Sequence, residues 1–374
     1  MTVKKQSSED KEMALSSIWK VRSEKLAPGA WLWWFWLFFI HDENTEKTGK
    51  CRQLMILWSV KNDRKISCNG LDISVPKQIE ALPGGKGWAL SGAAAAWYFD
   101  GKEMHDNFVL EKSDMQLDPH NRKLSAPGKT PSEFSEEDGE YITKIKSGET
   151  EFEFRAKQVD KHAAVGPHSG QTKLPFGFGV EGTRIEVLEL SGTEKCGNAE
   201  KRIHGTAYFQ KILLAIPPPQ WYWGIYHFSD GSYFTYMQTY MGRALLAHKS
   251  GMNTMLKKPS APLSSDIFFY HAPTGRFFEG HKLSVTPSKL EGGLWKHALL
   301  GSGKGFEISA EAKAYAHSSW VFEKQIGPLP ARSVFTYNEY PAVLSRLVVR
   351  LKSGETITLE KGVGNMENSW GFLL

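Results

Sequence analysis

Three polar side chains stand in strand-like segments that are otherwise rich in aromatic residues. Tyr208 and Gln210 alternate in the run GTAYFQK, so they share one face of a strand, and His227 ends the run QWYWGIYH. A hydroxyl, an amide and an imidazole on an apolar surface are groups that orient a ligand or move a proton. We therefore predict hydrogen-bonding or proton-transfer roles for Tyr208, Gln210 and His227. The alternative for each is a satisfied hydrogen bond inside the protein.

Aromatic residues in the same segments predict where a ligand would bind. The 374 residues include 13 Trp, 21 Phe and 12 Tyr, which is enough aromatic surface for both a core and a pocket. In a strand, Trp34 and Trp36 share one face and Trp33 takes the other. Ordinary core packing is the alternative for these side chains. The predicted ligand-binding residues are Trp34, Trp36, Trp221, Trp223 and Tyr236.

Two carboxylates have a local context that suggests a role. Glu367 precedes Asn368-Ser369-Trp370, where burial would raise the pKa of its carboxyl group and make it a general acid. An ion pair that closes the last strand is the other interpretation. Asp230 lies in Ser229-Asp230-Gly231, and the backbone chemistry of a turn is sufficient to explain it.

The sequence lacks the patterns of metal, phosphate and covalent chemistry. Its 12 histidines include no H-x-H or H-E-x-x-H spacing. Cys51, Cys68 and Cys196 have no C-x-x-C neighbour, and no G-x-S-x-G elbow occurs. The glycine-rich residues 301–305 lack the Lys-Ser/Thr ending of a phosphate loop. We expect no metal and no cofactor.

Charge and hydropathy argue against two kinds of partner, nucleic acid and the interior of a membrane. Lys and Arg number 46 against 41 Asp and Glu, but the basic residues are scattered, so nucleic acid is not an expected partner. The apolar run Trp31–Ile40 is about half the ~20 residues that span a bilayer, which favours a buried strand over a transmembrane segment. No signal peptide is visible and three cysteines suit a reducing compartment, so we expect a cytoplasmic protein. Transient membrane contact for ligand pickup is compatible with these features.

Short alternating runs between clusters of Gly, Pro, Asn and Asp predict strands and turns along most of the chain. Asp118–Glu140, rich in Pro, Ser, Gly and charge, is predicted as a surface loop, and Gly166–Gly182 as irregular. Helical periodicity is scarce outside a stretch around Lys11 to Glu24, so the fold class is predicted as all-β. Two hairpins are expected, one around the loop HDENTEKTGK and one at Asp100-Gly101, and they join Ala30–Ile40 to Cys51–Val60 and Gly87–Phe99 to Glu103–Lys112.

Three patches of the sequence resemble the hydroxyneurosporene synthase and carotenoid hydratase superfamily. The first is Trp33-Trp34-Phe35, followed by a polar turn and an apolar strand. The second runs from Leu190-Ser191-Gly192 to Asp230-Gly231-Ser232, and the third from Lys361 to Trp370. The resemblance implies two tandem lipocalin-like antiparallel β-barrels. The domains expected from it are a polar N-terminal tail at 1–25, a first barrel at 26–200 and a second barrel at 201–374.

The resemblance also implies a class of ligand. Its members include carotenoid hydratases and fungal Diels–Alderases, whose ligands are long and apolar. Where the hydratases carry an acidic or histidine group, this sequence has Gln210 and Lys211. A pocket is expected toward the junction of the two barrels, because the first two patches would meet there. Its expected lining is Trp34, Trp36, Tyr208, Gln210, Trp223 and Tyr236.

Three functions from different classes follow. The first is an enzyme that binds an apolar terpenoid- or polyketide-like molecule in an aromatic pocket and cyclises, isomerises or hydrates it without covalent catalysis. The second is a carrier or storage protein for a hydrophobic ligand, which the absence of an acid at Gln210 and Lys211 favours. The third is a pair of solidly packed barrels whose surface binds a protein partner.

Overall fold

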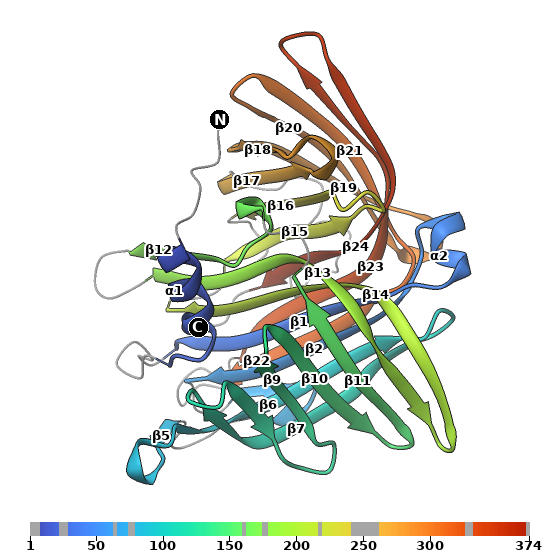
Figure 1. Ribbon diagram of the computed structural model, residues 1–374. Helices are drawn as coiled ribbons and strands as arrows, with labels where there is room; N and C mark the ends of the chain where they lie inside the picture. The colour runs from blue at the N-terminus through green and yellow to red at the C-terminus, as the bar shows by residue number, and fades with distance from the viewer. Residues whose placement is uncertain are drawn as a thin grey trace.

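The computed structural model describes residues 8–21, 29–62, 66–73, 79–158, 162–173, 179–215, 219–240, 262–325 and 332–371. Most of these residues are in strands, which form two antiparallel sheets of 12 strands each (Figure 1). The predicted all-β class is confirmed. No helix in the described ranges is long and apolar enough to cross a membrane.

The first sheet closes on itself. Its path runs β11-β10-β9-β8-β7-β6-β2-β1-β14-β13, and β13 pairs again with β11, so ten strands form a barrel. The two remaining strands, β5 and β12, pair with β6 and β13 outside this ring. The strands are β1 (Trp31–Ile40), β2 (Arg52–Lys61), β5 (Ile79–Ala81), β6 (Trp88–Phe99), β7 (Met104–Asp118), β8 (Lys123–Ala126), β9 (Ser132–Glu137), β10 (Glu140–Ser147), β11 (Thr150–Lys157), β12 (His168–Lys173), β13 (Gly179–Cys196) and β14 (Ala199–Leu214).

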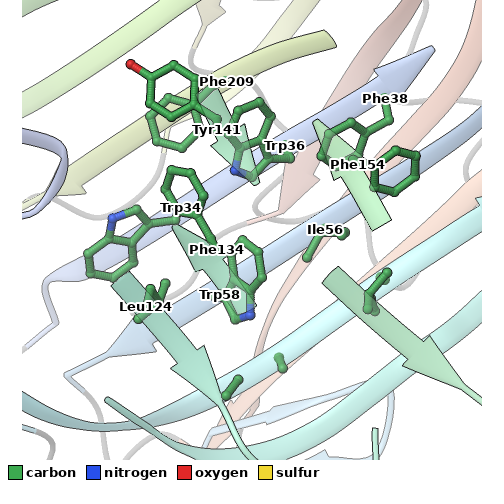
Figure 2. Close-up of a cluster of buried hydrophobic side chains, with 14 of the residues drawn as sticks. Trp34, Trp36, Phe38, Ile56, Trp58, Leu124, Phe134, Tyr141, Phe154 and Phe209 are labelled. Atoms are coloured by element: carbon green, nitrogen blue, oxygen red, sulfur yellow. The ribbon is translucent and has the colours of Figure 1, made fainter. Parts of the chain in front are cut away.

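Strand alternation fills the first barrel with aromatic rings. Trp34, Trp36 and Phe38 of β1 point inward, where they meet rings such as Phe134 from the opposite wall (Figure 2). The Trp36 and Phe38 rings stack with centroids 5.2 Å apart, and Phe38 stacks on Phe154 at 4.0 Å. This close packing makes the barrel interior an ordinary hydrophobic core.

Two helices flank the start and the end of β1. Helix α1 (Ser8–Ile18) lies against the barrel, where Trp34 Nε1 donates a hydrogen bond of 2.9 Å to the carbonyl of Ile18. Helix α2 (Glu43–Thr48) occupies the polar loop between β1 and β2. Asp42 caps it by accepting from the Thr45 N–H, and Gly49 ends it in the left-handed region at φ 72°.

The second sheet has an open path of nine strands, β18-β17-β16-β15-β24-β23-β21-β20-β19. Its two end strands are consecutive in the chain and are separated only by His281. Strand β22 pairs with β23, and β3 and β4 from the first part of the chain extend this edge. The strands are β3 (Ile66–Cys68), β4 (Leu71–Asp72), β15 (Gln220–His227), β16 (Tyr233–Tyr240), β17 (Pro262–His271), β18 (Arg276–Gly280), β19 (Lys282–Lys289), β20 (Trp295–Gly303), β21 (Phe306–Ala314), β22 (Ser318–Gln325), β23 (Arg332–Leu351) and β24 (Thr356–Gly371).

Two glycines let tyrosine rings lie against the second sheet. A Cβ atom on Gly224 would meet the Tyr236 ring at 2.6 Å, and one on Gly364 would meet the Tyr226 ring at 2.3 Å. The rings therefore occupy the space that side chains would take.

The two sheets pack against each other through their outer faces. The apolar part of this contact includes Phe35 and Tyr208 from the barrel and Trp223, Ile225 and Phe335 from the second sheet. These residues alternate along their strands with those that fill the two interiors. We call this region the inter-sheet contact.

The pairing confirms both predicted hairpins and corrects two other predictions. β1 pairs with β2, and β6 pairs with β7. The expected loop Asp118–Glu140 contains β8 and β9, and the expected irregular stretch Gly166–Gly182 contains β12. Both stretches contain short strands with many polar residues, so their composition resembles that of loops, although Leu124, Ala126 and Phe134 point into the barrel interior. The sheets change between Leu214 and Gln220, whereas the division into domains near residue 200 stays a prediction.

Candidate functional site

Two glutamates lie side by side in the inter-sheet contact. Glu339 of β23 and Glu367 of β24 are register partners, so their side chains are neighbours on one face of the sheet. They are 0% and 4% exposed. No cation contributes to the pKa of either carboxyl group. Two buried acids beside each other without a basic partner are costly unless they hold a proton.

The surroundings of the two carboxyl groups differ. Glu367 accepts a hydrogen bond of 2.7 Å from Trp221 Nε1 at one oxygen and another of 2.7 Å from the Tyr337 hydroxyl at the other. The carboxyl oxygens of Glu339 have no partner at good hydrogen-bond geometry, although the Tyr337 hydroxyl and Trp97 Nε1 lie close enough to lower its pKa. Well-aligned donors therefore favour the charged form of Glu367 more than that of Glu339.

These surroundings give the two carboxyl groups different pKa values. Burial raises the pKa of Glu367 to about 7, although the donors from Tyr337 and Trp221 oppose the rise. Burial, together with the neighbouring charge of Glu367, raises the pKa of Glu339 well above its usual value. The pair titrates as a unit and holds at least one proton near neutral pH, with Glu339 as the acid and Glu367 as the group that ionises first.

A β-bulge in β13 builds the other half of the site. Ile185 pairs with Phe209 and Leu188 with Ala207, so Glu186 and Val187 both stand opposite the single residue Tyr208. A bulge of this kind turns an extra side chain toward one face of the sheet. It sends Glu186 outward into the inter-sheet contact, where it is 2% exposed.

Polar side chains cluster beside this bulge. Arg184 and Gln210 are register partners, and the Tyr208 hydroxyl donates a hydrogen bond of 3.1 Å to Gln210 Oε1. Burial raises the pKa of the Tyr208 hydroxyl well above 10, which keeps it protonated. The Tyr208 ring lies 5.4 Å from the ring of Trp223, the register partner of Glu367. Tyr208 and Trp223 thus connect the bulge to the carboxyl pair.

His227 belongs to the same contact but its ring is fully engaged. Its Nε2 donates to the carbonyl of Glu186 at 2.8 Å, which leaves Nδ1 to accept from the Thr206 hydroxyl at 2.8 Å. Burial lowers its pKa to about 3, so the ring is neutral at physiological pH. This arrangement favours a role in holding β15 against the bulge, and the proton-transfer role stays a prediction.

Several side chains in the contact are partly exposed although their neighbours are buried. Arg184 keeps 34% of its side chain accessible, and Gln210, Trp221 and Tyr337 are half-buried. Trp221 and Tyr337 are the donors to the buried Glu367. Solvent therefore reaches the side chains that surround the carboxyl pair, although the pair itself is buried.

The structure brings together five of the eight predicted site residues, namely Tyr208, Gln210, Trp221, Trp223 and His227. Trp34 and Trp36 point into the first barrel, and Tyr236 points into the second sheet's interior, where its hydroxyl pairs with His297 Nδ1 at 2.7 Å. The prediction of one pocket lined by all six chosen residues is therefore wrong. Alternation shows which residues share a face, but it does not show which face becomes the interior.

Sequence reasoning missed Arg184, Glu186, Tyr337 and Glu339. The available signal was a charged residue on the apolar face of an alternating run, as in Phe335, Tyr337 and Glu339 of FTYNEY. For Glu367 the sequence left two interpretations open. Its burial and raised pKa agree with the structure, and the described residues supply no ion-pair partner, whereas a role as general acid stays a prediction.

Other locations in the described residues offer less chemistry. A cavity of about 250 Å³ lies between α1 and β12 to β14, and none of the eight predicted site residues lines it. Lys211 does line it, and Lys211 Nζ donates to the carbonyls of Ser17 and Lys20 at the end of α1. Within the described ranges, no group of three or more His, Cys, Asp or Glu residues is arranged to hold a metal ion.

Comparison with known proteins identifies solved structures that share the fold. No family model matches the sequence, and no curated protein matches it. The solved structures that it resembles include a Nitrosomonas europaea protein provisionally described as AttH, at 10% identity and a TM-score of 0.52, with 99% of this chain and 98% of that chain covered. They also include CghA with Sch210972, at 10% identity and a TM-score of 0.48 over 92% and 88% of the two chains. A third is kievitone hydratase from Nectria haematococca, at 12% identity and a TM-score of 0.42 over 95% and 94%. The likeness to the Nitrosomonas protein shows a shared fold along nearly the whole chain, and the predicted resemblance is confirmed at that level.

Proposed function

We propose that the protein binds an apolar terpenoid- or polyketide-like molecule at the inter-sheet contact and catalyses its cyclisation, isomerisation or hydration by proton transfer, without a cofactor or a covalent intermediate. The observation that carries the proposal is the buried pair of Glu339 and Glu367, which has no cation partner among the described residues. Buried acids whose pKa values are pushed apart are typical of acid–base catalysis.

The two carboxyl groups take different parts in this mechanism. Glu339, which is protonated, donates a proton to a conjugated double bond or its carbonyl oxygen. Glu367, as a carboxylate held by Trp221 and Tyr337, accepts a proton from another position of the substrate. Loss of a proton from carbon to Glu367 completes an isomerisation. Attack by a second double bond closes a ring and leaves a cation, which loses a proton to Glu367. Attack by water, followed by loss of one of its protons to Glu367, completes a hydration. In each case the proton count of the pair is restored.

Aromatic rings around the pair suit an apolar substrate. Trp221 and Trp223 lie on β15 directly beside Glu367, and Phe335 packs against Trp221 with ring centroids 5.5 Å apart. Rings of this kind supply contact area and stabilise developing positive charge through their faces. They also hold a flexible chain in one conformation, which is a large part of catalysis for a cyclisation.

The test is turnover of a panel of conjugated polyenes and unsaturated polyketides, followed by chromatography and mass spectrometry. Glu339→Gln and Glu367→Gln keep the shape of each side chain but remove the proton chemistry, and each should lower the rate by about 10²–10⁴-fold. Glu360→Gln, at an exposed position of the same strand β24, is the matched control and should retain full activity. Unchanged turnover in both buried variants would contradict the proposal.

Carriage of an unmodified ligand is the competing function. It was favoured by the absence of an acid at Gln210 and Lys211, but Lys211 is bound to the end of α1 rather than to the inter-sheet contact. Native mass spectrometry of freshly purified protein separates the two functions. One tightly retained, unmodified lipid, together with no product from any member of the panel, would favour carriage.

A further inference from the structure

Arg184 is a cation in the inter-sheet contact whose hydrogen-bonding capacity is largely unused. Its nearest acid is Glu186, whose Oε1 lies 3.7 Å from Arg184 Nε, too far for a good hydrogen bond. The guanidinium also lies over the Phe268 ring, 5.7 Å from its centroid. Glu186 approaches Nε, and a third of the Arg184 side chain stays accessible.

The other polar groups near Arg184 already have partners. The Tyr208 hydroxyl donates to Gln210 and lies close enough to Arg184 to accept from one of its N–H groups, and the Tyr233 hydroxyl donates to the carbonyl of Ala164 at 2.6 Å. Asp266 is paired with His281 at 2.7 Å. A guanidinium has five N–H donors in a planar fork, and leaving them without acceptors in a largely buried contact is costly.

Gln210 provides a second donor at the same place. It is the register partner of Arg184, so the two side chains stand next to each other on the outer face of the barrel. Its Oε1 accepts from Tyr208, which directs the amide nitrogen away from that hydroxyl, and no partner of this nitrogen occurs among the described residues. The Arg184 guanidinium and the Gln210 amide therefore offer N–H donors side by side.

We propose that Arg184 and Gln210 bind a planar, two-oxygen anionic head group of the ligand, a carboxylate. This inference rests on the proposed function, because it places the rest of the ligand at the carboxyl pair. A planar guanidinium binds two oxygens at once, which a lysine cannot do. The substrate class is accordingly an unsaturated chain that carries an acidic head group, rather than a pure hydrocarbon.

The path from this head-group site to the acids fits such a chain. Tyr208 stands between Arg184 and Trp223, and Trp223 is the register partner of Glu367. A ligand held at Arg184 would therefore extend across the Tyr208 and Trp223 rings and place its conjugated part beside Glu367. The head group sets the position of the reacting bonds relative to the proton donor.

The experiment compares retinoic acid with its methyl ester, two polyenes that differ in one charge. Binding to the full chain is followed by quenching of tryptophan fluorescence, because Trp221 and Trp223 border the site. The native protein should bind the acid about tenfold more tightly than the ester, as expected for a charge-assisted bidentate contact. Arg184→Met should remove this preference while leaving the affinity for the ester unchanged.

Three further variants separate the explanations. Arg202→Met, at an exposed position of the same β13–β14 hairpin, changes the net charge equally and should keep the preference. Gln210→Met should reduce the preference without abolishing it, and it tests the site independently if Arg184→Met fails to fold. Glu367→Gln should keep the preference even where it abolishes turnover, so failure of the catalytic proposal and failure of this one are distinguishable. Equal affinity of the native protein for acid and ester, or an undiminished preference in Arg184→Met and Gln210→Met, would overturn the inference.

Discussion

The interior of the first barrel and the inter-sheet contact are made by opposite faces of the same strands. They differ in whether their charged side chains have hydrogen-bond or ion-pair partners. Inside the barrel, the charged groups lie near the ends and have partners: Lys211 binds carbonyls of α1, and Arg52 pairs with Glu194 at 2.5 Å. In the contact, Glu339 has no partner at good hydrogen-bond geometry, and Arg184 has a long ion pair and lies over the Phe268 ring. The first pattern is typical of a stabilising core, whereas the second costs stability and is typical of a functional site.

Truncation of a barrel tryptophan should have the largest effect on stability. Trp34 is completely buried and also donates to the carbonyl of Ile18. Trp34→Ala should lower the free energy of unfolding by about 3–5 kcal/mol, because it removes a large side chain that the closed barrel cannot replace. Chemical denaturation measures this loss. A cost below about 1 kcal/mol would mean that the barrel interior tolerates a cavity and is not a close-packed core.

Removal of the carboxyl pair should have a smaller effect that depends on pH. Both carboxyl groups have a raised pKa in the folded protein, to about 7 for Glu367 against 4.5 for the ordinary group. Between those values the folded state binds more protons than the unfolded state, so native stability falls as pH rises. The double variant E339Q/E367Q lacks this dependence, and its gain over the native protein should grow by at least about 3 kcal/mol from pH 4.5 to 7, the contribution of Glu367 alone.

Urea unfolding at several pH values, with Glu360→Gln as the exposed control, measures that difference. A gain that is the same at every pH would mean that the acids are not protonated by burial. The contact would then resemble the barrel interior in its energetics, and the comparison above would lose its basis.

Loss of one hydroxyl in the contact should have the smallest effect on folding. Tyr208→Phe removes a hydrogen bond of 3.1 Å to a half-buried Gln210, which contributes about 0.5–1.5 kcal/mol. Ligand binding should be weakened more than stability, because the hydroxyl sets the orientation of the Gln210 amide. Thermal unfolding and retinoic acid titration of the same sample measure both. Unchanged binding and activity would indicate that Tyr208 is a packing residue.

The sequence was informative where local chemistry decides structure. Alternation in Trp31–Ile40 and the Asp100-Gly101 turn predicted strands and a hairpin that the structure confirms. Strands β8 and β9 were missed because they are short and have few apolar residues, so their composition matches that of loops.

The site was only partly predictable for a different reason. Tyr208, Gln210 and Trp223 were found because they stand in aromatic runs. Arg184 and Glu339 can be recognised as site residues only once the strand pairing is known. Nothing near Glu339 in the sequence indicates that Glu367 lies beside it. The choice of which face of β1 becomes the barrel interior likewise depends on closure of the whole sheet, which placed Trp34 away from the site.

The pairing of β3 with β22 affects whether the chain can be expressed as two separate fragments. Ile66–Cys68 adds to the edge of β22, so the early part of the chain completes the late sheet. A fragment that begins after residue 218 would carry β22 with an open edge, ready to pair with any extended peptide. The complementary fragment would offer the matching strand. The chain is therefore suited to reassembly from two co-expressed pieces, in which strand donation across the break acts as the recognition step.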